Sequence, residues 1–576
     1  MIHTINGPKR LKDVDWDEIS WKTIDKKVSL LQQRIFKASR DGNKSNVKYL
    51  QSVLVKLPES KLLAVRRVTT ENKGRKTGGI DKQIITTKTE KLKLTITLTL
   101  DGKASPIRRV WIPKSGKASM RPLGIPTIRD RAKQMLVKLA LEPAWEAKFE
   151  PNSYGFRPGR NCHDAIIAIF NNVRSTTKPK WILEADLQGC YDNIDHNYLI
   201  KCLEESPTYI ITQVKSWLQA GIFEGYLPYD KDFENIPVNS KGTPQGDIIS
   251  PLLANIALHG MEIHLKEWNS KLPEPDDSYK RPREKYTALG VVRYADDFVI
   301  THYDRQRIVE AKEELECWLK STSKLTLSET KTNIKFIREG FDFLGFLIVA
   351  VYRNGKPRTK IYPQKSSVKR ITQKAHNIIF SNKAARAEWL IIKLRPVLLG
   401  WANYFRYSEC SDTFTTLDHT IWKMLRKWVN RRSTAGGRIK AWNKYFPGTE
   451  TTFHGRIYKD KYILKSSSNK NETVFLPKIT WIEYQKWIKI KSDSSPYDRN
   501  NGYWANRKVS YAGLTTWQSN LLVKQNFICP KCGGEINPWS HIEVDHKKST
   551  GKGGSDNIKN KQVLHKICHI KKTNKE

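Results

Sequence analysis

Adjacent carboxylates lie where two strands are expected to end. The run Val291–Ile300 places Asp296 and Asp297 between two apolar halves, which predicts a β-hairpin with both carboxylates at its tip. A second apolar strand, Trp181–Ala185, runs into Asp186. Phosphoryl transfer with two Mg²⁺ ions, about 3.5–4 Å apart, requires carboxylates from separate strands to converge on both ions. Ordinary turn chemistry also explains an Asp-Asp pair, so this pattern alone leaves both explanations open.

A second reactive set lies near the C-terminus. Cys529-x₂-Cys532 and His565-x₂-Cys568 form two pairs separated by 32 residues. Four nitrogen and sulfur ligands in two such pairs are typical of a closed structural Zn²⁺ site. The chain has only eight cysteines in 576 residues, which excludes a disulfide scaffold.

The composition indicates a polyanionic partner. The formal net charge is +43, with Lys and Arg spread over the whole length, which favours nucleic acid over a basic membrane-surface helix. The longest apolar run, Phe343–Tyr352, is too short to span a bilayer. The polar start, Met1–Glu18, lacks an apolar signal region, so we expect a protein that is not secreted.

The elements that must position these groups follow from hydrophobic periodicity. An N-terminal helical hairpin is predicted on either side of Asp41-Gly42, with Val28 and Ile35 on one inner face and Leu50 and Leu54 on the other. A mixed helix and strand block follows to about residue 350. The pattern from about 365 to 432 is helical, and the sequence beyond it is rich in basic and aromatic residues.

The blocks around the carboxylates resemble, in order, those of group II intron reverse transcriptases. Tyr294-Ala295-Asp296-Asp297 resembles the catalytic box of that family. The other six matching blocks are Arg121–Pro126, Ser153–Arg160, Asp186–Ile194, Gly242–Asn255, Leu325–Thr332 and Phe343–Phe346. Seven ordered blocks make a chance match negligible.

The resemblance implies roles for individual positions. Asp186 and Asp296 would bind two Mg²⁺ ions, with Asp297 in support. Tyr191 would be the steric gate against a 2′-hydroxyl. The residues that would contact the dNTP substrate are Lys114, Arg121 and Gln245, and Asp247 stands where relatives commonly carry a second glycine. Lys331 would face the leaving phosphate, although a solvated lysine explains it equally well.

The helical segment after the palm resembles the maturase (X) domain, through Leu394–Phe405, and by position it is also the polymerase thumb. Its aromatic residues at helical spacing are most simply core. Basic side chains at its end are candidates for contacts with RNA phosphates: Lys423, Arg426, Lys427, Arg431 and Arg432.

The C-terminal module resembles an HNH (ββα-metal) nuclease. By that resemblance His546 is the general base, Asp545 and His569 bind one Mg²⁺, and Asn560 orients the loop that bears His546. The Cys529, Cys532, His565 and Cys568 set binds Zn²⁺. His541 is interpreted as a surface histidine. A plain zinc-ribbon DNA-binding module is the alternative.

These features predict an α+β multidomain protein with right-hand polymerase fingers and palm, a helical thumb and a zinc-containing ββα-metal module. The predicted divisions are an N-terminal helical extension with the start of the fingers (1–104), fingers and palm (105–350), thumb and maturase domain (351–432), a DNA-binding region (433–515) and an HNH endonuclease (516–576). The resemblance implies a reverse transcriptase, splicing maturase and DNA endonuclease that acts with its intron RNA on target DNA, with no membrane partner. It also implies the cytoplasm of a bacterium, or an organellar matrix or stroma, as the location. A splicing-only maturase and a host-adapted reverse transcriptase, of a retron or CRISPR system, are the alternatives.

Overall fold

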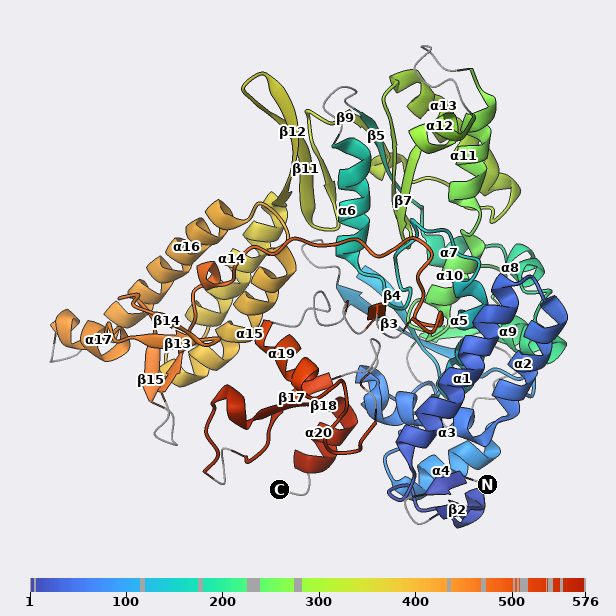
Figure 1. The fold of residues 1–576 in the computed structure, drawn as a ribbon, viewed down its shortest axis with the longest axis horizontal. Helices are drawn as coiled ribbons and strands as arrows, with labels where there is room; N and C mark the ends of the chain where they lie inside the picture. The colour runs from blue at the N-terminus through green and yellow to red at the C-terminus, as the bar shows by residue number, and fades with distance from the viewer. Residues whose placement is uncertain are drawn as a thin grey trace. The chain divides into compact units, whose positions relative to one another are not determined.

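A computed structural model of the chain describes the greater part of the sequence, with its elements labelled in Figure 1. The described residues are 2–4, 7–113, 120–174, 180–224, 239–273, 282–432, 437–467, 473–500, 503–504, 507, 516–534, 536, 542–549 and 553–573. The chain divides into two units. The first comprises Met1–Ala165, Leu183–Ile334 and Ile490–Glu576, and the second comprises Ile166–Ile182 and Lys335–Lys489. These two units divide the chain at other positions than the five predicted divisions, which stay a prediction.

The predicted N-terminal helical hairpin is confirmed in the first unit. Helices α1 (Trp21–Arg40) and α2 (Lys44–Lys56) flank the Asp41-Gly42 break, and Asn43 caps α2 through the Asn46 N–H. Their inner faces are buried. Gln32 and Gln51 donate hydrogen bonds to carbonyls of the long helix α5 (Ile128–Glu146). Further elements of this region are β1 (Ile2–Thr4), β2 (Gly7–Lys9), η1 (Leu11–Asp13), α3 (Pro58–Arg66), η2 (Arg67–Glu71), η3 (Lys73–Lys76) and α4 (Lys88–Thr97).

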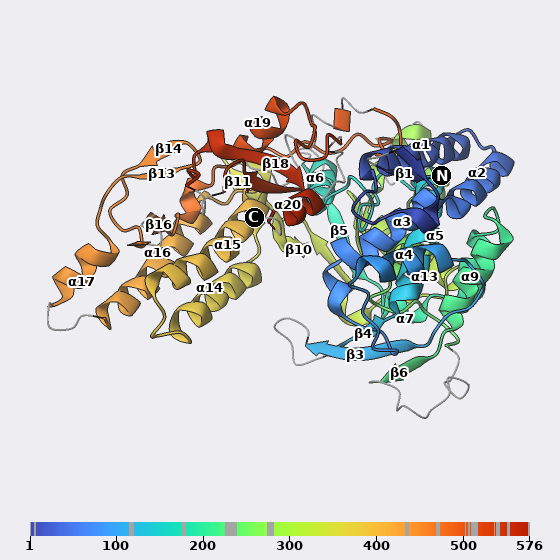
Figure 2. The same cartoon turned by 90° about the horizontal axis from the view of Figure 1, so that it is seen from below.

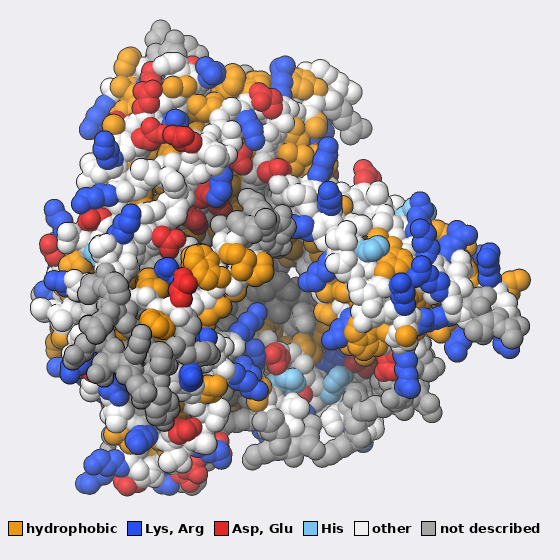
Figure 3. All heavy atoms as spheres, turned by 180° about the vertical axis from the view of Figure 1, so that it is seen from behind, with side chains coloured by type: hydrophobic (Ala, Val, Ile, Leu, Met, Phe, Trp, Pro, Cys, Tyr) orange, Lys and Arg blue, Asp and Glu red, His pale blue; other side chains and the backbone are white. Residues whose placement is uncertain are grey.

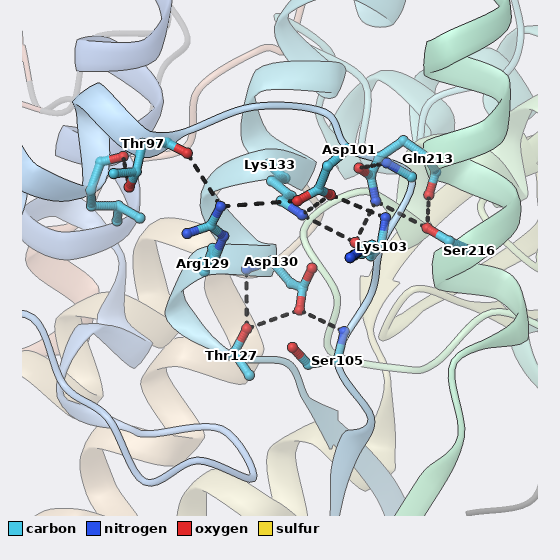
Figure 4. Close-up of polar contacts among 12 residues, drawn as sticks. Thr97, Asp101, Lys103, Ser105, Thr127, Arg129, Asp130, Lys133, Gln213 and Ser216 are labelled. Atoms are coloured by element: carbon cyan, nitrogen blue, oxygen red, sulfur yellow. Dashed lines mark hydrogen bonds and ion pairs between the residues drawn. The ribbon is translucent and has the colours of Figure 1, made fainter. Parts of the chain in front are cut away.

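The fingers sheet has the order β4-β3-β6 (Figure 2). Strands β3 (Ile107–Pro113) and β4 (Met120–Ile125) are antiparallel, and β6 (Ile222–Glu224) runs parallel to β3. The segment directly before β3 is held by residues at the start of α5. The buried Asp130 carboxylate accepts hydrogen bonds from Thr127 Oγ1 (2.9 Å) and the Ser105 N–H (3.1 Å), as Figure 4 shows.

The palm is a four-stranded sheet with the order β7-β8-β5-β9. Its strands are β5 (Trp181–Asp186), β7 (Gly290–Tyr294), β8 (Asp297–His302) and β9 (Asn333–Phe336). Central strands need apolar side chains on both faces, and accordingly Phe298, Val299 and Ile300 are completely buried. The helices of the fingers and palm are α6 (Cys162–Val173), α7 (Cys190–Asn193), α8 (His196–Cys202), α9 (Thr208–Gln219), α10 (Ser250–Ala257), α11 (Met261–Lys271), α12 (Pro282–Ala288) and α13 (Arg305–Ser321), with the short η5 (Glu329–Lys331).

The second unit contains the predicted helical segment, which is confirmed. Helices α14 (Lys365–Phe380), α15 (Ala387–Phe405) and α16 (Ser411–Asn430) follow a three-stranded sheet with the order β10-β11-β12. Lys and Arg side chains gather on the lobe that holds these helices (Figure 3). Its other elements are β10 (Phe341–Phe343), β11 (Phe346–Arg353), β12 (Lys356–Pro363), α17 (Gly437–Tyr445), β13 (Thr451–Phe453), β14 (Arg456–Tyr458), β15 (Lys465–Ser467), β16 (Thr473–Phe475) and η6 (Ile479–Trp481).

The chain ends in a small module of the first unit. Its elements are α19 (Thr516–Lys524), β17 (Ile542–His546), η8 (Ile558–Asn560), β18 (Lys561–His565) and α20 (Lys566–Thr573). Strands β17 and β18 are antiparallel, with α20 directly after them, which is a ββα arrangement. The module has a core of only a few buried side chains. Among the described residues of the whole chain, no helix is long and apolar enough to cross a membrane.

Candidate active sites

The predicted hairpin carries its carboxylates at a tight turn. Tyr294 pairs with Asp297, so Ala295 and Asp296 form the tip between β7 and β8. Ala295 has a φ of +59°, a left-handed conformation that is uncommon for a residue with a Cβ atom. Asp186 is the last residue of β5, as predicted.

The three aspartates interact through their charges. Burial, followed by repulsion from the Asp296 and Asp186 carboxylates, raises the pKa of Asp297 to about 7. Burial, together with the Asp186 charge, also raises the pKa of Asp296. Neighbouring carboxylates repel one another when all are ionised, and a bound cation reduces this repulsion. The donor set of three carboxylates therefore fits Mg²⁺.

Lys331 lies against this cluster. Its ammonium donates a hydrogen bond to Asp186 Oδ2, and this bond raises the pKa of Lys331. The Lys331 side chain is 57% exposed, so it can swing away from Asp186 when another cation is present. The Ser328 N–H donates to the Asp186 carbonyl (2.8 Å), which aligns the lysine's segment with the end of β5.

A buried polar network contacts the turn that Ala295 and Asp296 form. Arg293 donates to Asn255 Oδ1 (3.0 Å) and to the Ala295 carbonyl (3.3 Å), and Asn255 donates to the Gly155 carbonyl (2.8 Å). Glu150, also buried, lies 3.9 Å from the Arg293 guanidinium. A Cβ atom on Gly155 would lie 2.3 Å from the Ala295 nitrogen, so only glycine allows this approach.

The candidate nucleotide side of the site is built around Tyr191. The half-buried Tyr191 has a pKa raised well above its usual value by burial, followed by the Asp296 charge. The Thr243 N–H donates to the Tyr191 carbonyl (2.5 Å), and Tyr191 and Gln245 both line a cavity of about 300 Å³. Arg121 on β4 is exposed, and its positive charge partly offsets the rise in the pKa of Asp296. Lys114 lies outside the described residues.

The four predicted zinc ligands come together. The ligand atoms of Cys529, Cys532, His565 and Cys568 all lie within 4.8 Å of one another. Hydrogen bonds from Cys532 and Cys568 hold the pKa of the Cys529 thiol far below its ordinary value. Three cysteine sulfurs and one histidine nitrogen at this spacing are the donors of a structural Zn²⁺ site, so the residues fit that metal.

The predicted nuclease metal ligands lie on β17 and α20. His569 Nε2 is 3.6 Å from Asp545 Oδ1, and His569 Nδ1 is 2.6 Å from Glu543 Oε2. Lys572, one turn beyond His569, places its ammonium 2.8 Å from Asp545 Oδ2. A cation of the chain itself therefore faces this carboxylate, and the Mg²⁺ site at Asp545 and His569 stays a prediction.

His546 and Asn560 occupy the loop between β17 and β18. His546 Nε2 lies 2.9 Å from Asp556 Oδ1. The Asn560 amide accepts from the Lys548 N–H (3.0 Å) and donates to the Lys548 (2.9 Å) and Ser555 (2.7 Å) carbonyls. Asn560 therefore braces the loop after His546, and its orienting role in catalysis stays a prediction. His541 lies outside the described residues.

The basic side chains of α16 differ from one another. Lys423, Lys427 and Arg431 are exposed, and so is Arg426, whose guanidinium lies 5.7 Å from the centre of the Trp422 ring and 5.8 Å from that of Trp442. Arg432 instead donates to the Lys383 and Ala385 carbonyls and lies 3.7 Å from the centre of the Trp428 ring. These contacts join the end of α16 to the turn between α14 and α15, and a phosphate-binding role for Arg432 stays a prediction.

Several site residues were not predicted from the sequence. They are Glu150, Arg293 and Asn255 beneath the catalytic turn, and Glu543, Asp556 and Lys572 in the C-terminal module. Glu543 carried a detectable signal, because it is two residues before Asp545 and so shares its face of a strand. The others follow from tertiary contacts.

Comparisons with known proteins match four segments. Residues 112–348 match the reverse transcriptase (RNA-dependent DNA polymerase) family, and residues 16–98 match the N-terminal domain of reverse transcriptase. Residues 368–446 match the group II intron maturase-specific domain, and residues 529–575 match HNH endonuclease.

Three similar proteins illustrate the relationship. Protein YkfC of Escherichia coli is 33% identical over 313 residues, which cover 50% of this chain and 80% of that protein. Group II intron-encoded protein LtrA of Lactococcus lactis is 33% identical over 334 residues, 49% of this chain and 54% of LtrA. An uncharacterized 91 kDa protein in the cob intron of Schizosaccharomyces pombe is 28% identical over 434 residues, 64% of this chain and 50% of that protein. The chain thus spans about half the length of the latter two.

Proposed function

Since the chain belongs to the family of group II intron-encoded proteins, with reverse transcriptase, maturase and HNH endonuclease regions, we propose that it copies intron RNA into DNA, assists splicing of that RNA and cuts one strand of a DNA target. The cut end would prime the copying. The observation that carries the proposal is the convergence of Asp186, Asp296 and Asp297 from two palm strands, which a splicing-only protein does not need.

In the polymerase site, the carboxylates of Asp186, Asp296 and Asp297 would hold two Mg²⁺ ions. Mg²⁺, when bound there, supplies the positive charge that phosphoryl transfer needs at the attacking and leaving oxygens. Arg293 and Asn255 keep the Ala295-Asp296 turn in its strained conformation, so the carboxylates are preorganised. Lys331, released from Asp186, would turn its ammonium to the leaving phosphate.

Nucleotide binding would involve the fingers and the cavity beside Tyr191. Arg121, and Lys114 seven residues before it in sequence, would contact the triphosphate, for which the planar guanidinium of arginine is well shaped. The Tyr191 ring would lie beneath the sugar and exclude a 2′-hydroxyl. Gln245 lines the same cavity and would contact the nucleotide from the opposite side.

Intron RNA would be bound by the exposed basic residues of the second unit. Lys423, Arg426, Lys427 and Arg431 on and after α16 present charge to solvent. Structured RNA is recognised largely through its backbone and shape, to which such charges contribute affinity. Residues 433–515, where Arg438, Lys440, Trp442 and Lys444 lie, would contribute DNA contacts.

In the C-terminal module, His546 would take the proton of the attacking water. Because Nε2 faces the Asp556 carboxylate, Nε2 carries the proton in neutral histidine and Nδ1 is left as the base. Asn560 braces the loop that holds this imidazole. Asp545 and His569 would hold one Mg²⁺, which when bound supplies charge to the scissile phosphate. Zn²⁺ in the Cys529, Cys532, His565 and Cys568 set would be structural.

The test is primer extension on an RNA template by purified full-length protein. Asp296→Asn should abolish extension, because the carboxylate charge is removed while the shape is kept. Asp13→Asn changes an exposed aspartate away from the site and should extend normally. Extension by Asp296→Asn at the wild-type rate would contradict the assignment, and a wild-type protein without extension would favour a splicing-only maturase.

A further inference from the structure

The segment that carries Gln245 is held on two sides. On one side, the Gly242 N–H donates to the Ile194 carbonyl (2.9 Å) and the Thr243 N–H donates to the Tyr191 carbonyl (2.5 Å). On the other side, the Gly124 N–H of β4 donates to the Gln245 carbonyl (2.5 Å). The segment therefore bridges the Tyr191 turn and the strand that carries Arg121, and its placement sets the width of the cavity between them.

The approach to β4 is close enough to depend on correct placement of the backbone. Gly246 has a φ of +122°, and a Cβ atom on it would lie 2.3 Å from the Gly124 carbonyl oxygen. A conformation that most residues avoid persists only where the surrounding structure holds it. On the β4 side, the backbone contact that holds Gly246 in this conformation is the hydrogen bond from Gly124 to Gln245. We therefore expect side chains to supply further support.

Those side chains are Gln134 and Asp247. Gln134 on α5 is 1% exposed and uses both ends of its amide: Nε2 donates to Asp247 Oδ2 (2.8 Å), and Oε1 accepts from the Ile248 N–H (3.1 Å). Asp247 is 5% exposed, and its Oδ1 has no hydrogen-bond partner among the described residues. The pair thus fixes the residues directly after Gln245-Gly246 to a helix.

Helix α5 is a rigid base for this attachment. Within one turn of Gln134, the Asp130 carboxylate is occupied by Thr127, Ser105 and Trp217 Nε1 (Figure 4 shows the first two). Arg131 donates to the Pro126 and Gly74 carbonyls (both 3.0 Å) and to that of Thr77. Asp130 and Arg131 are the charged groups that act on Asp247, with opposite sign, and both are engaged elsewhere.

We propose that Gln134 and Asp247 form a positioning pair that holds Gln245-Gly246 against Gly124 and thereby sets the affinity of the polymerase site for the incoming nucleotide. The pair touches no substrate and acts through Gln245. The inference rests on the proposed reverse transcriptase function, which it deepens by naming what orders the nucleotide cavity.

The charge state of Asp247 matters to the pair. Burial raises the pKa of Asp247 to about 7, against the opposing effect of the Gln134 hydrogen bond. The neutral acid accepts the Gln134 N–H without an uncompensated charge, whereas the ionised form leaves a buried oxygen with no donor. The segment is therefore held best below pH 7, and nucleotide affinity should fall as the pH rises above 7.

The experiment measures steady-state dTTP incorporation by the full chain on a poly(rA) template with an oligo(dT) primer. Gln134→Met and Asp247→Ala should raise the KM for dTTP about three- to tenfold, the range expected when part of a buried hydrogen bond's contribution is removed, with kcat within about twofold. Asp247→Asn keeps an acceptor and no charge, so its KM should match wild type at pH 6.5 and, unlike wild type, not rise between pH 7 and 8.5.

The matched control is Gln32→Met. Gln32 is a buried glutamine that donates to the Leu139 carbonyl of the same helix (2.9 Å), away from the cavity. It should lower the melting temperature comparably but leave the KM unchanged. Equal KM values for Gln134→Met and Gln32→Met, or equal values for Asp247→Asn and Asp247→Ala, would overturn the inference alone. Should Asp247→Ala not fold, the two glutamine variants decide. A wild-type protein that extends no primer overturns the proposed function and the inference together.

Discussion

His569 Nδ1 lies 2.6 Å from Glu543 Oε2, while His569 Nε2 faces Asp545. Since a carboxylate can only accept, Nδ1 carries the proton and the Nε2 lone pair is left for a metal ion. A carboxylate behind a metal-ligating histidine fixes both its ring orientation and its tautomer. Glu543 is therefore expected to orient one of the two nuclease metal ligands.

The first prediction concerns Glu543. Glu543→Ala should lower DNA strand cleavage or the apparent Mg²⁺ affinity about 10- to 100-fold, as is typical when such an outer carboxylate is removed. The measurement is cleavage of labelled target DNA by the reconstituted ribonucleoprotein over a Mg²⁺ titration. Lys566→Ala, which removes a weaker partner of Glu543 at 3.9 Å, is the control and should cleave normally. Equal cleavage by both variants would show that His569 needs no orienting partner.

The second prediction separates zinc structure from nuclease chemistry. Cys532→Ser should release zinc and unfold the C-terminal module, because so small a core depends on its metal site. His546→Ala should keep zinc and fold but stop cleavage of one strand, since His546 is the predicted general base for the water. Zinc content and strand-specific cleavage are measured together. Loss of zinc from His546→Ala would make that histidine structural.

The third prediction concerns the basic face of α16. Replacing Lys423, Arg426 and Lys427 by glutamine should weaken RNA binding and reduce the slope of log K against log salt by about 0.7 to 0.9 for each phosphate that these side chains neutralise. Arg432→Gln should instead lower thermal stability, because its guanidinium binds backbone carbonyls. Filter binding at several salt concentrations and thermal melting test the two. An unchanged slope in the triple variant would mean that the face is only solvated.

The fourth prediction follows from the raised pKa of Asp247. An aspartate with a pKa near 7 in the folded chain and near 4 in the unfolded chain is protonated only when folded between those values. The unfolded state therefore binds fewer protons, and the free energy of unfolding contributed by Asp247 falls as pH rises from 4 to 7, then stays constant. Asp247→Asn removes this dependence, so its stability relative to wild type should grow over that interval. Urea unfolding at pH 4.5, 6 and 7.5 measures the difference, and a constant difference would refute the shift.

Local sequence patterns predicted much of the framework because they reflect local physics. The two apolar halves of Val291–Ile300 on either side of Asp296-Asp297 are typical of a hairpin, and the helical spacing around α16 predicts its buried face. The zinc set was predictable because two short chelate pairs carry their own geometry. The two carbonyls that Arg432 binds lie in the turn between α14 and α15, and nothing in its sequence neighbourhood reveals them.

The sequence by itself determined which chemistry the chain can perform: three palm carboxylates, a Cys and His metal set and a surplus of positive charge, in a fixed order. Only the tertiary structure decided how those groups are held. The partners of Gln134, Arg293 and Glu543 are mostly distant in sequence, as in the 113-residue separation of Gln134 and Asp247, or depend on strand and helix packing. The physical reason is that a buried polar side chain must find a partner wherever the fold supplies one, and sequence spacing carries no record of that choice.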